Sequence, residues 1–149
     1  MRLLHVTDLH FEQTHFDWVW RRRHEVDAVC ITGDFLEPAL PVALSEQIKW
    51  VSAWLGSFDT PIFVCTGNHD IEQADLIALS LEELFFGEER PAETPWMSRI
   101  VNPMLTRDGQ QLEISNVRIG CMPYDSFSFE AFSSCDVVLT HVPQASTLV

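Results

Sequence analysis

Positive charge is scarce in this sequence. The 149-residue chain has 9 lysine and arginine residues against 22 aspartates and glutamates, and Lys49 is its only lysine. The formal net charge of −13 has the wrong sign for a protein that holds nucleic acid by neutralising phosphates. The one basic run, Arg21 to His24, ends a short helix predicted at about 16–24, where cations complement the helix dipole. We interpret it as a helix end rather than a phosphate-binding patch, so the composition disfavours nucleic acid as a partner.

Long apolar runs and paired cysteines are also absent. No stretch approaches the roughly 20 consecutive apolar residues of a membrane helix, so we predict no membrane partner. The chain enters a predicted strand at once, with no charged-then-apolar leader. Its four cysteines stand singly, without a C-x-x-C spacing, which is typical of buried reduced thiols rather than of a zinc site. Together these features predict a cytoplasmic protein.

Four polar clusters each follow a short apolar run. Parallel strands buried on both faces have such continuous apolar sequences, and α/β folds place ligands at the carboxyl ends of these strands. Side chains from four strand ends, with mixed nitrogen and oxygen donors, predict a two-metal site that suits Mn, Fe or Zn better than Ca or a lone Mg. The clusters are Asp8-x-His10, Gly33-Asp34, Gly67-Asn68-His69-Asp70 and Thr140-His141.

The order of the predicted elements indicates an α/β fold. Strands at 2–6, 27–32 and 61–65 alternate with the helix near 16–24, a helix from Pro41 through Leu55 and an acidic helix at about 72–85. An irregular connector over 87–97 leads to short strands at 99–101, 111–114, 117–122 and 136–140, with a tight turn at Ser115-Asn116. We therefore predict one domain, residues 1–149, of two packed β-sheets with helices outside.

Taken together, the clusters resemble the calcineurin-like metallophosphoesterases. That family's pattern is D-x-H, G-D, G-N-H followed by Asp or Glu, a histidine after an apolar strand, and finally G-H-x-H. D-x-H and G-D are weak signals alone, but G-N-H-D is more specific, and the first four elements occur here in order over residues 2–143. The fifth is absent, because the sequence after His141 continues Val-Pro-Gln-Ala-Ser-Thr-Leu-Val. The resemblance implies an α/β/β/α sandwich, which we expect to be incomplete at its C-terminus and to lack its last strands.

The resemblance also implies a role for each cluster. Asp34 would bridge two divalent ions, one oxygen to each, while Asp8 and His10 hold the first ion and Asn68 and His141 the second. The ions would share and activate a water that attacks a phosphate ester. His69 would protonate the leaving oxygen, and Asp70 would accept the other N–H of His69. Asp70 can also serve as a turn residue or as the N-cap of the helix at 72, and the two roles are compatible. Without G-H-x-H each ion keeps three protein ligands, so we expect the second site to be weak or empty. His15, in the loop after the ligand pair, is a weaker candidate for substrate contact.

These features predict a metal-dependent phosphoesterase that hydrolyses a phosphodiester or a phosphorylated small molecule. The alternative is a scaffold of the same fold that has lost its metals, and the third is a DNA-repair-type nuclease, which the acidic surface disfavours. The strand before His141 would lack sheet partners, and an unpaired edge favours homo-oligomers. A monomer whose edge is capped by Pro143 is the alternative.

Overall fold

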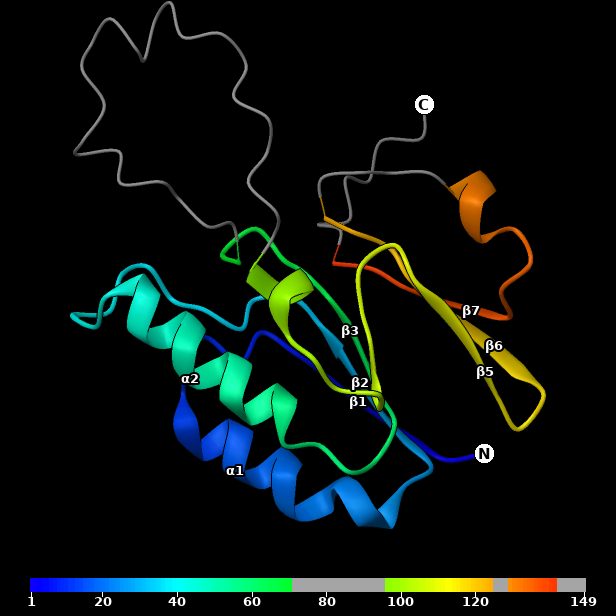
Figure 1. The fold of residues 1–149 in the computed structure, drawn as a ribbon, viewed down its shortest axis with the longest axis horizontal. Coiled ribbons are helices and arrows are strands. Elements are labelled where there is room, and N and C mark those ends of the chain that lie inside the picture. Colours follow the sequence, from blue (N-terminus) through cyan, green and yellow to red (C-terminus); the bar gives the residue numbers. More distant parts are fainter. Residues whose placement is uncertain (71–95, 125–128, 142–149) are drawn as a thin grey trace, which may run out of the picture.

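Two β-sheets form the centre of the molecule. The computed structural model describes residues 1–70, 96–124 and 129–141 (Figure 1). The first sheet is parallel, with its strands in the spatial order β1 (Leu3–Thr7), β2 (Ala28–Thr32), β3 (Ile62–Cys65) and β4 (Leu105–Thr106). The second sheet has the order β5 (Gln111–Ile114), β6 (Val117–Cys121) and β7 (Val137–Leu139); β5 and β6 are antiparallel, and β6 and β7 are parallel.

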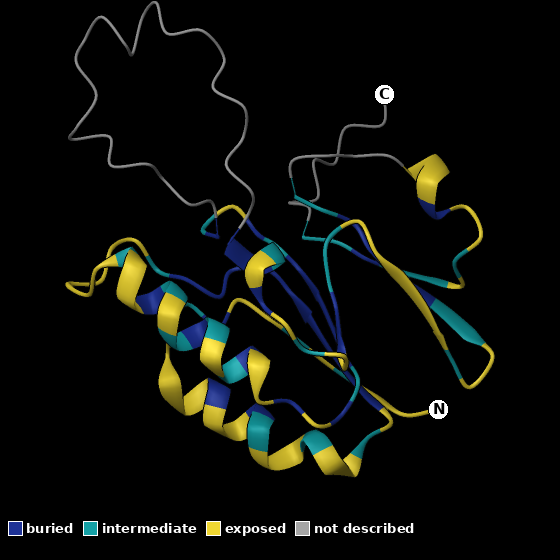
Figure 2. Cartoon of the chain, in the orientation of Figure 1, coloured by how far each residue is buried: buried dark blue, intermediate teal, exposed yellow. Residues whose placement is uncertain are grey.

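Two helices cover one face of the first sheet. They are α1 (Gln13–Arg22), continued by the short 3₁₀ helix η1 (Arg23–Glu25), and α2 (Leu44–Gly56) (Figure 1). Each helix carries a buried stripe that faces the sheet (Figure 2), so an amphipathic pattern in the sequence becomes one side of a core. Trp50 and Trp54 of α2 pack edge-to-face on Phe16 of α1, with ring centroids 5.1 and 5.0 Å apart. Among the described residues, no helix is long and apolar enough to span a membrane.

The other face of the first sheet packs on the second sheet. Its apolar contacts come from alternate residues of four strands: Ala28, Cys30, Phe63, Cys65, Ile119, Cys121 and Leu139. On the outer face of the second sheet lies the 3₁₀ helix η3 (Phe129–Phe132), whose Phe132 ring would collide with any Cβ at Gly120. The layer order of helix, sheet, sheet and short helical turn confirms the predicted fold class. All four cysteines are free, and burial raises the pKa of Cys30 to about 11.

Two predicted helices start at other residues, and one predicted strand is wrong. The helix after Pro41 begins only at Leu44, and α1 begins at Gln13, which places His15 in a helix rather than in a loop. Residues 99–101 are not a strand, because η2 (Trp96–Arg99) occupies this region and Arg107 donates hydrogen bonds to the carbonyls at 97 and 100 (3.0 and 2.7 Å). The first sheet instead gains its fourth strand at β4. The predicted helix at 72–85 lies outside the described residues.

Candidate metal centre

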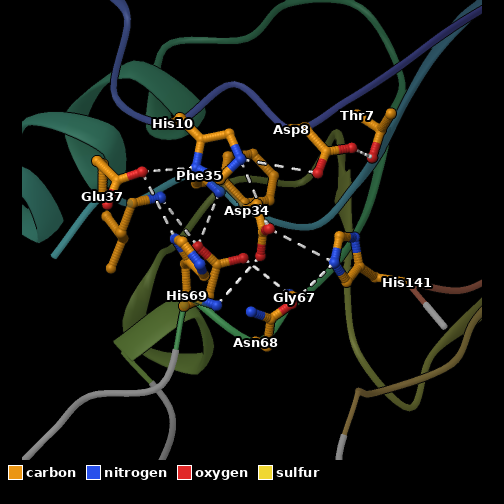
Figure 3. A network of polar contacts seen from close by, with 12 residues as sticks. Thr7, Asp8, His10, Asp34, Phe35, Glu37, Gly67, Asn68, His69 and His141 are labelled. Carbon is orange, nitrogen blue, oxygen red and sulfur yellow. Dashed lines mark hydrogen bonds and ion pairs between the residues drawn. The ribbon is translucent and has the colours of Figure 1, made fainter. Parts of the chain in front are cut away.

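The strands of the first sheet end side by side. Thr7, the last residue of β1, pairs with Thr32 at the end of β2, and Thr32 pairs with Cys65 at the end of β3. The three loops that follow therefore leave the sheet at one edge. Strand β7 of the second sheet contacts β2 and β3, and His141 reaches the same edge. The structure thus brings all four polar clusters together (Figure 3).

The loops that carry these residues have an unusual backbone. Asp8, His10 and Asp34 adopt positive φ values of 55°, 45° and 54°, a left-handed conformation that non-glycine residues rarely take. Backbone hydrogen bonds join the two loops in this shape: the N–H of His10 donates to the carbonyl of Asp34 at 2.8 Å, and that of Asp8 to the carbonyl of Gly33 at 3.3 Å. Strain held by cross-links of this kind keeps side chains in place before any ligand binds.

The first ligand group consists of Asp8, His10 and Asp34. The Nε2 atom of His10 lies 3.7 Å from Oδ1 of Asp8 and 3.7 Å from Oδ2 of Asp34. The three ligand atoms all lie within 4.8 Å of one another. The Thr7 hydroxyl lies 2.5 Å from the other Asp8 oxygen and orients that carboxylate. Two carboxylates and an imidazole on one loop pair can hold a divalent cation.

The second ligand group consists of His141, Asn68 and again Asp34. The Nδ1 atom of His141 lies 2.8 Å from the carbonyl oxygen of Thr32, which can only accept, so this nitrogen carries the proton of the neutral ring. Its Nε2 lone pair then points to Oδ1 of Asn68 at 3.1 Å and to Oδ2 of Asp34 at 3.5 Å. In this tautomer three possible ligand atoms converge. A bound cation would satisfy all three.

Asp34 takes part in both groups through a single oxygen. The carboxylate is buried, only 4% exposed, and its Oδ2 faces the Nε2 atoms of both His10 and His141. Its Oδ1 accepts the backbone N–H of His69 at 3.1 Å. Asp34 is thus the residue common to both groups, and its bridging of two ions stays a prediction. One oxygen is fixed by the chain, and the other is shared.

His69 lies beside the first ligand group and belongs to neither group that shares Asp34, although ligand atoms of His69, His10 and Glu37 also lie within 4.8 Å of one another. Its ring packs edge-to-face on the ring of His10 at a centroid distance of 4.9 Å. The Nδ1 atom of His69 is 3.7 Å from Oε2 of Glu37, and the same oxygen is 2.9 Å from Nδ1 of His10 (Figure 3). Glu37 therefore faces both imidazoles on the side away from the Asp8 and Asp34 carboxylates.

Glu37 was missed in the sequence, although it follows Asp34 by only three residues in the same loop. Its backbone is clamped by the fully buried Gln47 of α2: the N–H of Glu37 donates to Oε1 of Gln47 at 2.9 Å, and Nε2 of Gln47 donates to the carbonyl of Glu37 at 3.0 Å. The N–H of Ala39 together with the nearby His69 and His10 lowers the pKa of Glu37, which keeps its carboxylate charged. The available signal in the sequence was Gln47, a polar residue at a position on the apolar face of its helix, where it would need polar partners from a neighbouring loop.

Asp70 does not have the expected partner. Oδ1 of its carboxylate accepts the backbone N–H groups of Phe35 and Leu36 at 2.8 and 3.0 Å, and Oδ2 accepts that of Gly67 at 2.8 Å. The expected hydrogen bond with the His69 side chain is therefore wrong. Burial raises the pKa of Asp70 to about 7, and the negative charge of Asp34 adds to this rise while the N–H groups oppose it. Asp70 ties the loop after β2 to the loop after β3; the helix it was to cap lies outside the described residues.

Replacing Asp70 with alanine should lower the free energy of unfolding of the metal-free protein by about 3 kcal/mol or more, because three buried N–H groups would lose their acceptor. Denaturant unfolding followed by circular dichroism measures this. Asp17→Ala, on the exposed side of α1, is the matched control and should change stability by less than about 0.5 kcal/mol. Equal stability of the Asp70 variant and the control would show that this carboxylate does not tie the two loops.

A hollow of about 380 Å³ opens over the ligand groups. Asp8, Asp34, Asn68 and His141 are among its walls, so the ligand atoms can be reached by a small molecule. Two glycines allow this close assembly. A Cβ at Gly67 would overlap the Asp34 carboxylate, and one at Gly33 would lie 2.5 Å from Nδ1 of His141. Gly33 also has φ of +77°, which a side chain would strain.

Comparison with known proteins agrees with this geometry. Over residues 1–146 the chain matches the family model described as calcineurin-like phosphoesterase, and it belongs to this family. The family implies divalent metal ions and the hydrolysis of phosphate esters, and the donors gathered at the sheet edge are of the kind such ions bind. No curated protein matches the chain.

Proposed function

We propose that this protein is a dinuclear-metal phosphoesterase that acts on a phosphodiester or a phosphorylated small molecule. The observation that carries the proposal is the position of Asp34, whose Oδ2 lies between Nε2 of His10 at 3.7 Å and Nε2 of His141 at 3.5 Å. Each imidazole brings one further oxygen ligand, from Asp8 or from Asn68. Two adjacent sites that share one carboxylate are what a two-ion clamp on a phosphoryl group needs.

The donor sets differ between the two sites. Asp8, His10 and Asp34 offer two carboxylates and an imidazole, whereas Asn68, His141 and Asp34 offer one carboxylate, an amide and an imidazole. Mixed nitrogen and oxygen donors favour Mn, Fe or Zn. Because the second set has less negative charge, it should bind its ion more weakly and lose it first.

The side chains around the ions have separate tasks. When bound, two divalent ions would supply positive charge that activates water and offsets the charge of the phosphoryl oxygens. His69 donates a proton from its Nε2 to the leaving oxygen, while the Glu37 carboxylate, 3.7 Å from Nδ1, places negative charge on the other side of the ring. Asp70 acts one step further away: it fixes the loops that carry Asp34 and His69 and does not touch the His69 ring.

A small ester suits the surroundings better than a polyanion. The net charge of −13 repels nucleic acid, and the hollow over the ligand groups is of the size of a small-molecule site. Cytoplasmic location and self-association remain predictions of the sequence.

The test is metal-dependent turnover. We expect the protein to bind Mn²⁺ in calorimetric titrations and then to hydrolyse bis(4-nitrophenyl) phosphate, with the rate abolished by a chelator and restored by Mn²⁺ or Zn²⁺. No turnover at any metal concentration, with either a diester or 4-nitrophenyl phosphate, would favour the scaffold alternative. Faster cleavage of single-stranded DNA than of the small esters would favour the nuclease.

A further inference from the structure

A second hollow adjoins the metal centre on the far side of Asp8. Its volume is about 260 Å³, and it shares Thr7 and Asp8 with the hollow over the ligand groups. The rest of its wall is largely apolar: Val6 and Leu9 come from the end of β1 and its loop, and His15 and Trp18 come from α1. A molecule bound to the ligand groups could therefore extend past Asp8 into an apolar recess.

Trp18 is the distinctive residue of this recess. All five tryptophans of the chain lie in its described part, and Trp18 alone is exposed, at 48% of its surface; the other four are buried or half-buried. Trp18 and His15 are three residues apart on α1, so both rings lie on the same side of the helix. The recess is thus lined by the Trp18 indole and the His15 imidazole, next to the ligand groups.

The charges around the recess indicate which chemical groups it can bind. Among its lining residues none is a lysine or an arginine. The guanidinium of Arg22 lies 5.6 Å from the centroid of the Trp18 ring, and Arg22 is paired with Glu25 at 3.0 Å. A second phosphate in this recess would be repelled by the Asp8 carboxylate, and no lysine or arginine lines the recess to offset that repulsion. A neutral flat ring can instead stack on the exposed indole, and aromatic stacking needs no charge.

We propose that this recess, with Trp18 as its stacking platform, binds a planar aromatic group carried by the phosphate ester. This inference rests on the proposed function, since it places the phosphate over Asp8, Asp34 and His141 and the ring on the other side of Asp8. The substrate would then carry an aryl or heteroaryl substituent. Trp18 would be the residue that makes the protein prefer such esters to alkyl esters. His15 lines the edge of the ring site.

Two non-hydrolysable probes test the assignment. Phenylphosphonate and methylphosphonate present similar anionic groups but differ in the ring, and Zn²⁺-loaded protein can be titrated with each by calorimetry. We expect phenylphosphonate to bind about 5- to 20-fold more tightly, in line with the strength of aromatic stacking. Trp18→Ala should abolish this preference and leave methylphosphonate binding unchanged, and Trp18→Phe should keep most of it. Phe129→Ala, which removes another exposed ring outside the recess, is the control and should behave like the wild type.

A second readout separates this inference from the proposed function. The indole N–H resonance of Trp18, assigned from its loss in Trp18→Phe, is followed by NMR in the metal-free and Zn²⁺-loaded protein during titration with phenol and with phenylphosphonate. Movement of that resonance with the aryl probes, even in a protein that hydrolyses no ester, would support the recess while the proposed function failed. Turnover without any aryl-dependent change in the Trp18 resonance, or an unchanged preference in Trp18→Ala, would overturn the inference and leave the function in place.

Discussion

Asp34→Asn is expected to weaken both metal sites at once. Oδ2 of this carboxylate faces both ligand imidazoles, so a neutral amide would remove the shared negative charge from the two sites together. Mutation of residues that only support a metal ligand costs about 10- to 100-fold in affinity, so loss of a direct, shared ligand should exceed about 100-fold at each site. Calorimetric titration with Mn²⁺ measures the affinities, and turnover of bis(4-nitrophenyl) phosphate should fall in parallel.

The matched control for Asp34→Asn is Asp17→Asn, the same chemical change on the exposed side of α1. It should bind Mn²⁺ and turn over substrate as the wild type does. Asp8→Asn provides the contrast, because Asp8 faces only His10 and should weaken one site alone. If Asp34→Asn also weakened only one site, Asp34 would not be shared and the dinuclear arrangement would be wrong.

The ligand residues at the sheet edge could be predicted from the sequence because each of them lies next to its strand in the chain. Each ligand cluster follows an apolar run directly, and parallel strands must end at a common edge, so the convergence of Asp8, Asp34 and Asn68 needs only strand order. The hairpin turn at Ser115 and Asn116 was equally readable; both residues have positive φ, 52° and 63°, as a two-residue hairpin loop of this type requires.

Contacts that depend on tertiary packing could not be predicted in this way. Asp70 follows His69 in the chain, and proximity in sequence suggested a pair, but its carboxylate turns away to three backbone N–H groups of two loops. Glu37 reaches the histidines because Gln47, ten residues later on α2, holds its backbone. Similarly, the segment 99–101 has a β-like composition but is not a strand, and Arg107 donates hydrogen bonds to the carbonyls of Met97 and Ile100. No local pattern encodes these partners.

His69→Ala is expected to separate chemistry from metal binding. The His69 ring belongs to neither of the two ligand groups that share Asp34, and only its backbone N–H contacts Asp34. With His10 and Glu37 it forms a separate set of possible ligands, which this variant also tests. Removing the ring should therefore leave Mn²⁺ affinity within a few-fold of the wild type, whereas loss of a general acid lowers the rate by about 10²- to 10⁴-fold. Steady-state kinetics with bis(4-nitrophenyl) phosphate and with a diester of a poorer leaving group measure the effect.

The leaving group decides whether His69 donates the proton. 4-Nitrophenolate leaves readily without protonation, so the loss in His69→Ala should be smaller for its esters than for an alkyl ester, whose alkoxide needs the proton. His24→Ala is the control, because His24 lies in η1, where it pairs with Asp59, and the change should affect neither rate nor metal affinity. An equal loss of turnover for both leaving groups would contradict the acid role. A parallel loss of Mn²⁺ affinity would instead show that His69 is a metal ligand. The metal site would then be the one formed by His69, Glu37 and His10, in which Oε2 of Glu37 faces Nδ1 of both histidines.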